Sequence, residues 1–180
     1  MRAVAGLPSL RAPNLRRILV DAIAATRRDD ARIVHFSIQG DHLHLLVEAR
    51  DARALTAAIR GLAVRAARAI NRLLARRGRV WGDRYYRRDL ATPREVRNAL
   101  VYVLGNALHH GRRVVGLDAC SSAPWFDGWS ERPAARPPDA PPVSPPETWL
   151  LAVGWRRRLG PLRADEAPRR GAAKEAWRGR

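Results

Sequence analysis

Two histidines separated by one residue, His42 and His44, are the side chains of this sequence with the clearest potential for chemistry. They fall in residues 41–49, where apolar and polar residues alternate as in a half-buried β-strand. Alternate residues of a strand point to the same face, so the two imidazoles are expected about 6.6 Å apart along the strand. Neutral imidazole is the commonest metal ligand in proteins. The pair is therefore a candidate for binding one divalent metal, although two ordinary surface histidines would show the same spacing.

A second group of polar side chains falls on a predicted helix that begins at Thr92. The segment Thr92-Pro93-Arg94-Glu95 is a capping box with proline in the first turn, and the helix is predicted to run to about His109. Tyr102 and Asn106 are four residues apart, so they lie one turn apart on the same face. If this helix crosses the sheet face that carries the histidines, Asn106 offers a third ligand and Tyr102 places its phenol beside the metal. The alternative is a half-buried tyrosine and a solvated asparagine.

These residue types suit the cleavage of a phosphodiester. A divalent metal polarises the scissile phosphate and positions it for in-line attack. A phenol that attacks the phosphorus forms a covalent phosphotyrosine and splits strand transfer into two steps. Two imidazoles and one amide would leave positions open for phosphate oxygen and water. Mg²⁺ or Mn²⁺ is the expected metal, and imidazole suits Mn²⁺ better.

The elements that must position these residues follow from periodicity. Residues 41–49 form a predicted β-hairpin with residues 32–39, joined by a tight turn at Gly40. The order β-α-β-β-α-β-α predicts an α+β fold, a ferredoxin-like antiparallel sheet with helices on one face. The other predicted elements are a short strand at 2–5, a helix at 14–28 capped by Asn14, a helix at 52–77, and a strand or extended segment at 80–90.

The composition changes after residue 117. We expect a catalytic domain at 1–117, a proline-rich linker at 118–146, and a basic, tryptophan-containing tail at 147–180 that is partly disordered. The single cysteine, Cys120, excludes an internal disulfide framework. No apolar run reaches the roughly 20 residues of a membrane span. The sequence therefore predicts a cytoplasmic, nucleoid-associated protein with no membrane partner.

The charge favours a nucleic-acid partner. The chain has 34 Lys and Arg residues against 17 Asp and Glu, a formal charge of +17. A coding sequence rich in G and C would also favour arginine, and a row of arginines on a helix is often an ordinary solvated face. The candidate nucleic-acid-binding residues are Arg65, Arg68, Arg72 and Arg76 on the long helix, followed by Arg84, Tyr85 and Arg87.

Three segments together resemble a known family. Gly40-Asp41-His42-Leu43-His44-Leu45-Leu46-Val47-Glu48 is similar to the His-hydrophobic-His segment of single-tyrosine HUH transposases, whose close relatives are the REP-associated tyrosine transposases. Ala99-Leu100-Val101-Tyr102-Val103-Leu104-Gly105-Asn106 resembles their Tyr-x-x-x-Asn helix, and Val80-Trp81-Gly82-Asp83-Arg84-Tyr85-Tyr86 resembles the aromatic strand before it. The resemblance covers roughly residues 15–111.

The resemblance implies a transposase that cuts single-stranded or hairpin DNA through a 5′-phosphotyrosine at Tyr102. His42, His44 and Asn106 would be the metal ligands, and the protein would work as a monomer or a homodimer. Two features depart from the family pattern. The strand before the first helix is reduced to Arg2-Ala3-Val4, and the family's Asn-Pro step reads Asn106-Ala107.

Other interpretations use some of the same residues. Tyr85 and Tyr86 are rival nucleophiles, although adjacent residues of a strand point to opposite faces and only one of them would face the metal. A histidine-triad nucleotide hydrolase needs a further histidine where Leu46 stands. The alternative from another class is a domesticated, non-catalytic protein that binds single-stranded DNA or RNA through its basic surface.

Overall fold

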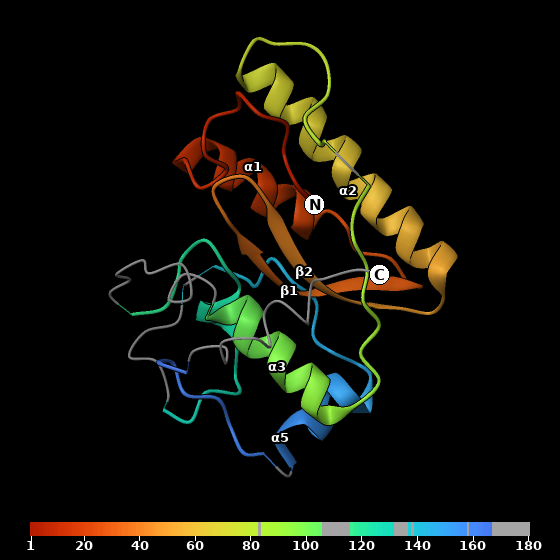
Figure 1. Ribbon diagram of the computed structural model, residues 1–180, viewed down its shortest axis with the longest axis vertical. Coiled ribbons are helices and arrows are strands. Elements are labelled where there is room, and N and C mark those ends of the chain that lie inside the picture. The colour runs from red at the N-terminus through yellow and green to blue at the C-terminus, as the bar shows by residue number, and fades with distance from the viewer. Residues whose placement is uncertain (83, 106–115, 132–136, 138, 158, 167–180) are drawn as a thin grey trace.

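The predicted hairpin is the centre of the fold. Strands β1 (Ala31–Ile38) and β2 (Leu43–Ala49) pair antiparallel in the computed structural model, which describes residues 1–82, 84–105, 116–131, 137, 139–157 and 159–166 (Figure 1). The amide of Gln39 donates to the carbonyl of His42 at 2.7 Å and closes the turn. On one face, β2 buries Leu43 and packs Leu45 and Val47 against the core, as the alternation predicts.

A β-bulge changes the expected alternation in β1. Strict alternation along residues 32–39 would place Val34, Phe36 and Ile38 on one face, but the pairing register shifts between Ile33 and His35. Val34 is the extra residue of this bulge. Its side chain points to the opposite face and packs in a different hydrophobic cluster from Phe36 and Ile38. Strict alternation is the wrong expectation at Val34 because a bulge leaves no reliable mark on the hydrophobic pattern.

Two short segments extend the sheet by single bridges. Arg2 pairs with His42, and Ala3 pairs with Trp81, both antiparallel. The amide of Ala3 donates to Asp41 at 2.7 Å and that of Val4 donates to Val80 at 2.9 Å. The segments therefore lie in the order 80–82, 2–4, β2, β1, but among the described residues only β1 and β2 form a ladder. The segments expected to be extended at 2–5 and 80–90 join the sheet through single bridges, so in the described residues neither forms a strand over its expected length. Gly6, with φ of 83°, turns the chain after the first segment.

Helix α1 (Pro13–Ala24) is shorter than the predicted 14–28. Its N-cap residue is Ala12, which has no capping side chain, so the prediction that Asn14 caps the helix is wrong. Pro13 begins the helix instead, since its fixed φ suits the first turn. After Ala24 the chain leaves the helix, and the Thr26 hydroxyl donates to the carbonyl of Ala22 at 2.7 Å.

The other long helices begin where their caps predict. Asp51 caps α2 (Ala52–Leu73) by accepting from the amide of Ala54 at 2.8 Å. The helix stops before the predicted residue 77, and Ala75 adopts a φ of 48°. Helix α3 (Pro93–Leu104) has the predicted capping box, in which Thr92 and Glu95 each accept from the other's amide. Its predicted continuation to His109 lies outside the described residues.

Helices cover both faces of the hairpin, so the prediction of helices on one face is wrong. Helices α1 and α2 pack on the face that carries Phe36 and Leu43, while α3 packs on the opposite face against Val34 and Leu46 (Figure 1). That second face has apolar side chains of its own, which must be buried against another element. The α3 stripe that supplies it is Val96, Leu100, Val101, Val103 and Leu104.

The described parts of segments 118–146 and 147–180 also contact the sheet and α3. Ile38 donates to the carbonyl of Cys120 at 2.8 Å, and Ser122 donates to Phe36 at 3.0 Å. Ser144 donates to Ile33 at 2.9 Å further along the same edge. These bonds cover the outer edge of β1, which would otherwise expose unpaired amides and carbonyls.

The C-terminal described residues add short helical turns to the α3 side. These are η1 (Ala123–Trp125), the π-helical η2 (Leu150–Gly154) and α5 (Trp155–Arg157). The Glu48 carboxylate accepts from the amides of Glu147 and Thr148 at the start of this region. Trp155 is buried against Phe126, with ring centroids 5.6 Å apart. Within the described residues, no helix is long and apolar enough to cross a membrane.

His35 provides a test of this packing. Its ring stands edge-on to Phe126, its Nδ1 lies 3.2 Å from the Ser122 hydroxyl, and burial lowers its pKa to about 3. The unfolded chain binds this proton near pH 6.5, so His35 favours folding fully above that pH and progressively less below it. Between about pH 6.5 and pH 5, above the carboxylate range, we expect a loss of about 2 kcal/mol in the free energy of unfolding.

Urea unfolding at the two pH values measures this loss, with His35→Gln as the comparison. The variant should show a flatter pH dependence, because glutamine does not titrate. Equal pH dependence in the two proteins would show that His35 is not held neutral by the fold.

Candidate metal and tyrosine site

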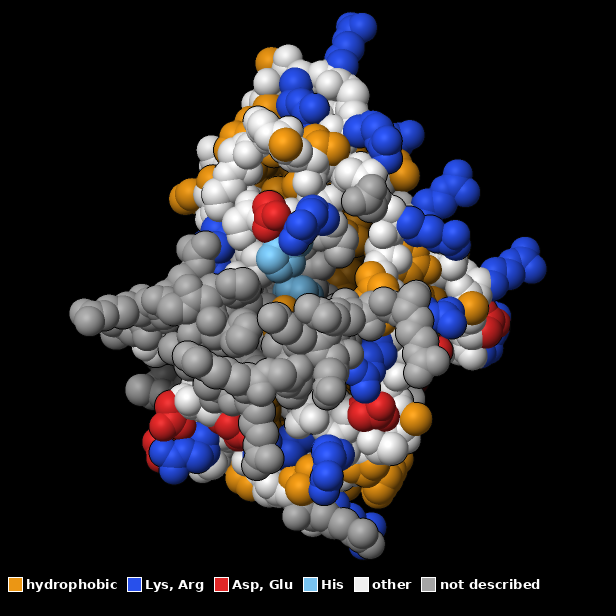
Figure 2. Space-filling view, viewed as in Figure 1, with side chains coloured by type: hydrophobic (Ala, Val, Ile, Leu, Met, Phe, Trp, Pro, Cys, Tyr) orange, Lys and Arg blue, Asp and Glu red, His pale blue; other side chains and the backbone are white. Residues whose placement is uncertain are grey.

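His44 of β2, and His42 just before this strand, lie on the side of the sheet that α3 covers. Leu43 and Leu45 pack in the core with α1 and α2, so the intervening His44 points the opposite way. The rings of His42 and His44 stand edge to face with centroids 4.6 Å apart. The side chain of His42 is 19% exposed, and histidine atoms reach the surface near the centre of Figure 2. The prediction that both imidazoles share one face is therefore confirmed.

Helix α3 brings the predicted tyrosine to this face. The capping box fixes the start of the helix, and Leu100 and Val103, both fully buried, fix its rotation against the sheet. The Tyr102 hydroxyl then lies 3.5 Å from Nε2 of His44, and the two rings stand edge to face with centroids 5.0 Å apart. Tyr102 and His44 are 58 residues apart in the sequence and meet because α3 packs against β2.

Asp41 is a site residue that the sequence pattern did not reveal. Its Oδ1 lies 2.6 Å from Nδ1 of His42, and its Oδ2 lies 3.5 Å from Nε of Arg2. The hydrogen bond with His42 holds the pKa of the Asp41 carboxyl below its ordinary value. In the sequence, an aspartate at position 41 is accounted for by the tight turn that joins the two strands. Its position directly before His42 was the available signal.

Asn106, the expected third ligand, lies outside the described residues, as do His109 and His110. Among the residues that the structure does describe, no three His, Cys, Asp or Glu side chains form a group able to hold a metal. The two imidazoles are suited to be two of the ligands of a divalent ion. They are adjacent and on one face, and a carboxylate orients one of them.

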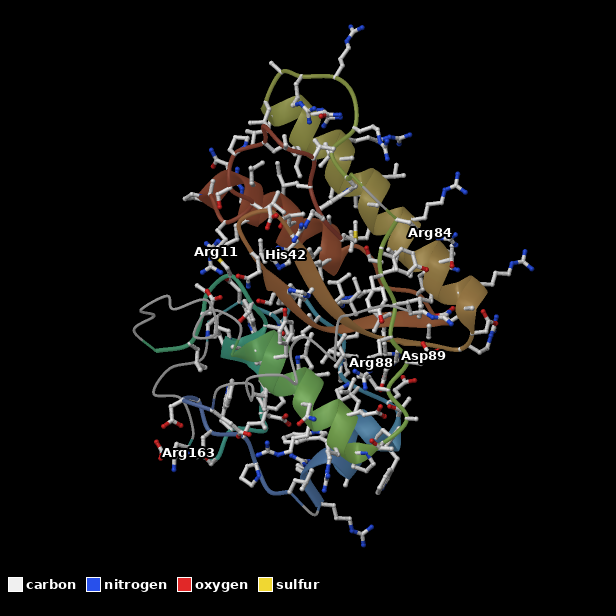
Figure 3. The ribbon with its side chains drawn as sticks, in the orientation of Figure 1. Arg11, His42, Arg84, Arg88, Asp89 and Arg163 are labelled. Atoms are coloured by element: carbon white, nitrogen blue, oxygen red, sulfur yellow. The ribbon has the colours of Figure 1, made fainter. Side chains whose placement is uncertain are left out.

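Of the two rival tyrosines, Tyr85 lies against α2, on the other face of the sheet. The Tyr85 hydroxyl is 3.1 Å from the hydroxyl of Thr56 on α2, the helix on the other face of the sheet. Tyr85 and Arg84 line a small hollow of about 190 Å³ with Arg60 and Trp81, and Figure 3 places Arg84 alongside α2. Tyr86 is 46% exposed. Tyr102 has its hydroxyl and its ring against His44.

The predicted nucleic-acid-binding arginines divide into two groups. Arg65 donates to the Thr26 hydroxyl at 2.9 Å and joins α2 to α1, and Arg76 donates to Asn71 and to the carbonyl of Arg79. Arg87 pairs with Asp89 at 3.2 Å. These contacts are structural.

Arg68 and Arg72 have a different setting. Arg53, Arg60, Arg68 and Arg72 line an open groove along the outer face of α2, and Arg65, bonded to Thr26, borders the same groove. Basic side chains spread along this helix in Figure 2. In the described part of the chain none of these four pairs with a carboxylate, and α2 itself contains no acidic residue. The groove lies across the sheet from Tyr102, because α2 and α3 cover opposite faces.

Comparison with known proteins gives one match. A family model described as IS200-like transposase matches residues 14–103, half of the chain. No curated protein and no solved structure matches. The matched range contains α1, the hairpin with both histidines, α2, and α3 as far as Tyr102. The chain therefore belongs to the family of IS200-like transposases, the single-tyrosine HUH transposases.

Proposed function

We propose that this transposase is a metal-dependent endonuclease and strand transferase that acts on single-stranded DNA with hairpin or repeat structure. The observation that carries the proposal is the contact between Tyr102 and His44, with His42 beside them on the same face. In this arrangement the phenol oxygen attacks the scissile phosphorus. It forms a 5′-phosphotyrosine, releases a 3′-hydroxyl and gives up the phenolic proton. A 3′-hydroxyl reverses the step and reseals the strand.

In this reaction the residues of the chain position the nucleophile and the imidazoles. The capped helix α3 holds the phenol, and β2 with the residue before it holds the two imidazoles beside it. His42, His44 and Asn106 are the residues that would hold Mg²⁺ or Mn²⁺. When bound, the metal would polarise the phosphate and stabilise its developing charge. The bridged segments 2–4 and 80–82 fit a ferredoxin-like sheet order, which supports the same interpretation of the fold.

The DNA would also contact the groove on the outer face of α2. Guanidinium groups on a surface without carboxylates attract phosphates through charge and counterion release. Arg68 and Arg72 are the proposed phosphate contacts from the predicted row, and Arg53 and Arg60 line the same groove.

The nucleophile is tested by trapping the covalent product. The purified protein is incubated with Mn²⁺ or Mg²⁺ and labelled hairpin oligonucleotides from the DNA that flanks its gene. Denaturing gels then reveal any covalent adduct. We expect a metal-dependent adduct in the wild type and none in Tyr102→Phe or in the double variant His42→Ala/His44→Ala.

Tyr85→Phe and Tyr86→Phe are the matched controls and should retain the adduct. Tyr102→Phe should unfold within about 1 kcal/mol of the wild type, because it keeps the packed ring and the hydroxyl that it removes makes a long hydrogen bond to His44. An adduct that persists in Tyr102→Phe would assign the nucleophile elsewhere. Tight binding without an adduct, on oligonucleotides that include the natural ends, would favour a non-catalytic binding protein.

The arginine groups make a separate prediction about binding. Arg68→Ala/Arg72→Ala should weaken binding to single-stranded DNA and reduce the slope of log K against log salt by about 0.7 for each phosphate that the variant no longer neutralises. The matched control is Arg16→Ala/Arg76→Ala, which removes the same charge and leaves the groove lining intact, since Arg16 donates to the carbonyl of Ala119 and Arg76 donates to Asn71 and Arg79. Its main effect should be on folding, with the free energy of unfolding lowered by about 1 kcal/mol for each hydrogen bond that the substitutions remove. Equal salt slopes in the two double variants would place the DNA away from this groove.

A further inference from the structure

Asp41 makes two contacts that the proposed reaction does not use. One carboxylate oxygen lies 2.6 Å from Nδ1 of His42, and the other lies 3.5 Å from Nε of Arg2. Arg2 is held opposite the turn by its bridge to His42 and by the bond from the amide of Gly82 to its carbonyl. The carboxylate is thus placed between an imidazole and a guanidinium.

The carboxylate has little part in holding the fold. The backbone bonds that close the turn and join the first segment to β2 run between main-chain atoms: Gln39 to His42, Ala3 to Asp41, and Leu43 to Met1. None of them uses the Asp41 side chain. That side chain is 61% exposed, where an ion pair contributes little to stability. A function other than folding is the better explanation for so short a contact.

The contact determines which nitrogen of His42 carries the proton. Neutral imidazole has one N–H and one lone pair, and a carboxylate beside Nδ1 favours the proton there. The lone pair is then on Nε2. A carboxylate that accepts from a histidine in this way also makes the opposite nitrogen more basic and holds the ring in one orientation.

We propose that Asp41 is a positioning residue that fixes His42 as the Nδ1–H tautomer, so that Nε2 is its metal-binding nitrogen, with Arg2 holding the carboxylate in place. This inference rests on the proposed function, since it assumes that His42 binds a metal. It adds a residue and a mechanism that the predicted ligand set did not contain. His44 has a different neighbour, Tyr102, so the two ligands are oriented by different means.

Two measurements on the full chain test this proposal without DNA. Long-range ¹⁵N–¹H spectra of ¹⁵N-histidine-labelled protein report the tautomer of His42, and electron paramagnetic resonance of free Mn²⁺ reports its affinity. In the wild type we expect the Nδ1–H tautomer. Asp41→Ala should lose that preference and bind Mn²⁺ about tenfold more weakly, at the lower end of the range for such orienting residues. Asp41→Asn keeps an acceptor oxygen and should lose less.

Asp89→Ala is the matched control. It removes one carboxylate that is also exposed and paired with an arginine, so it makes the same change in net charge. An Nε2–H tautomer in the wild type, an absence of Mn²⁺ binding, or equal Mn²⁺ affinity in Asp41→Ala and Asp89→Ala would each overturn the proposal. Adduct formation by the wild type together with any of these results would sink the inference about Asp41 and leave the proposed nuclease standing.

Discussion

The site depends on one constraint, the alternation of side chains along β2. Leu43 and Leu45 pack in the core with α1 and α2, and this obliges His44 to face α3. A slip of one residue in the pairing with β1 would bury the histidines and expose the leucines, so the hydrophobic core and the candidate site enforce the same register. The separation of the imidazoles is therefore a property of the sheet, and it is available before any ligand binds.

Local signals predicted the parts of the site that local structure determines. The hairpin, the shared face of His42 and His44 and the capping box at Thr92 all follow from neighbouring residues, and all are confirmed. The placement of α3 on the opposite face from α1 and α2 depends on Val34 and Leu46, which belong to distant elements. The bulge at Val34 disguised that second apolar face. The contact between Tyr102 of α3 and His44 could not be predicted from the sequence, because two residues 58 positions apart leave no periodic pattern that links them.

The arginine row shows a similar limit. Helical spacing groups Arg65 with Arg68 and Arg72, but the structure gives them different surroundings. All three border the open groove, but Arg65 also donates to the hydroxyl of Thr26 on α1. A modest rotation around the helix axis separates an arginine that joins two helices from one that faces solvent. Charge composition predicts a basic surface, and only tertiary contacts identify which cations remain for a phosphate.

The opposite placement of groove and tyrosine restricts the path of a bound strand. Under the proposed function, DNA that contacts α2 and also reaches Tyr102 must pass around an edge of the sheet. The edge at β1 is covered by residues 120–122 and Ser144. The other side carries the connection from α2 to α3, which runs past the sheet in Figure 1 and contains Arg84, Tyr85 and Arg87. A cation and an aromatic ring on this connection suit a strand's phosphates and bases, so this side is the more favourable route between the two surfaces.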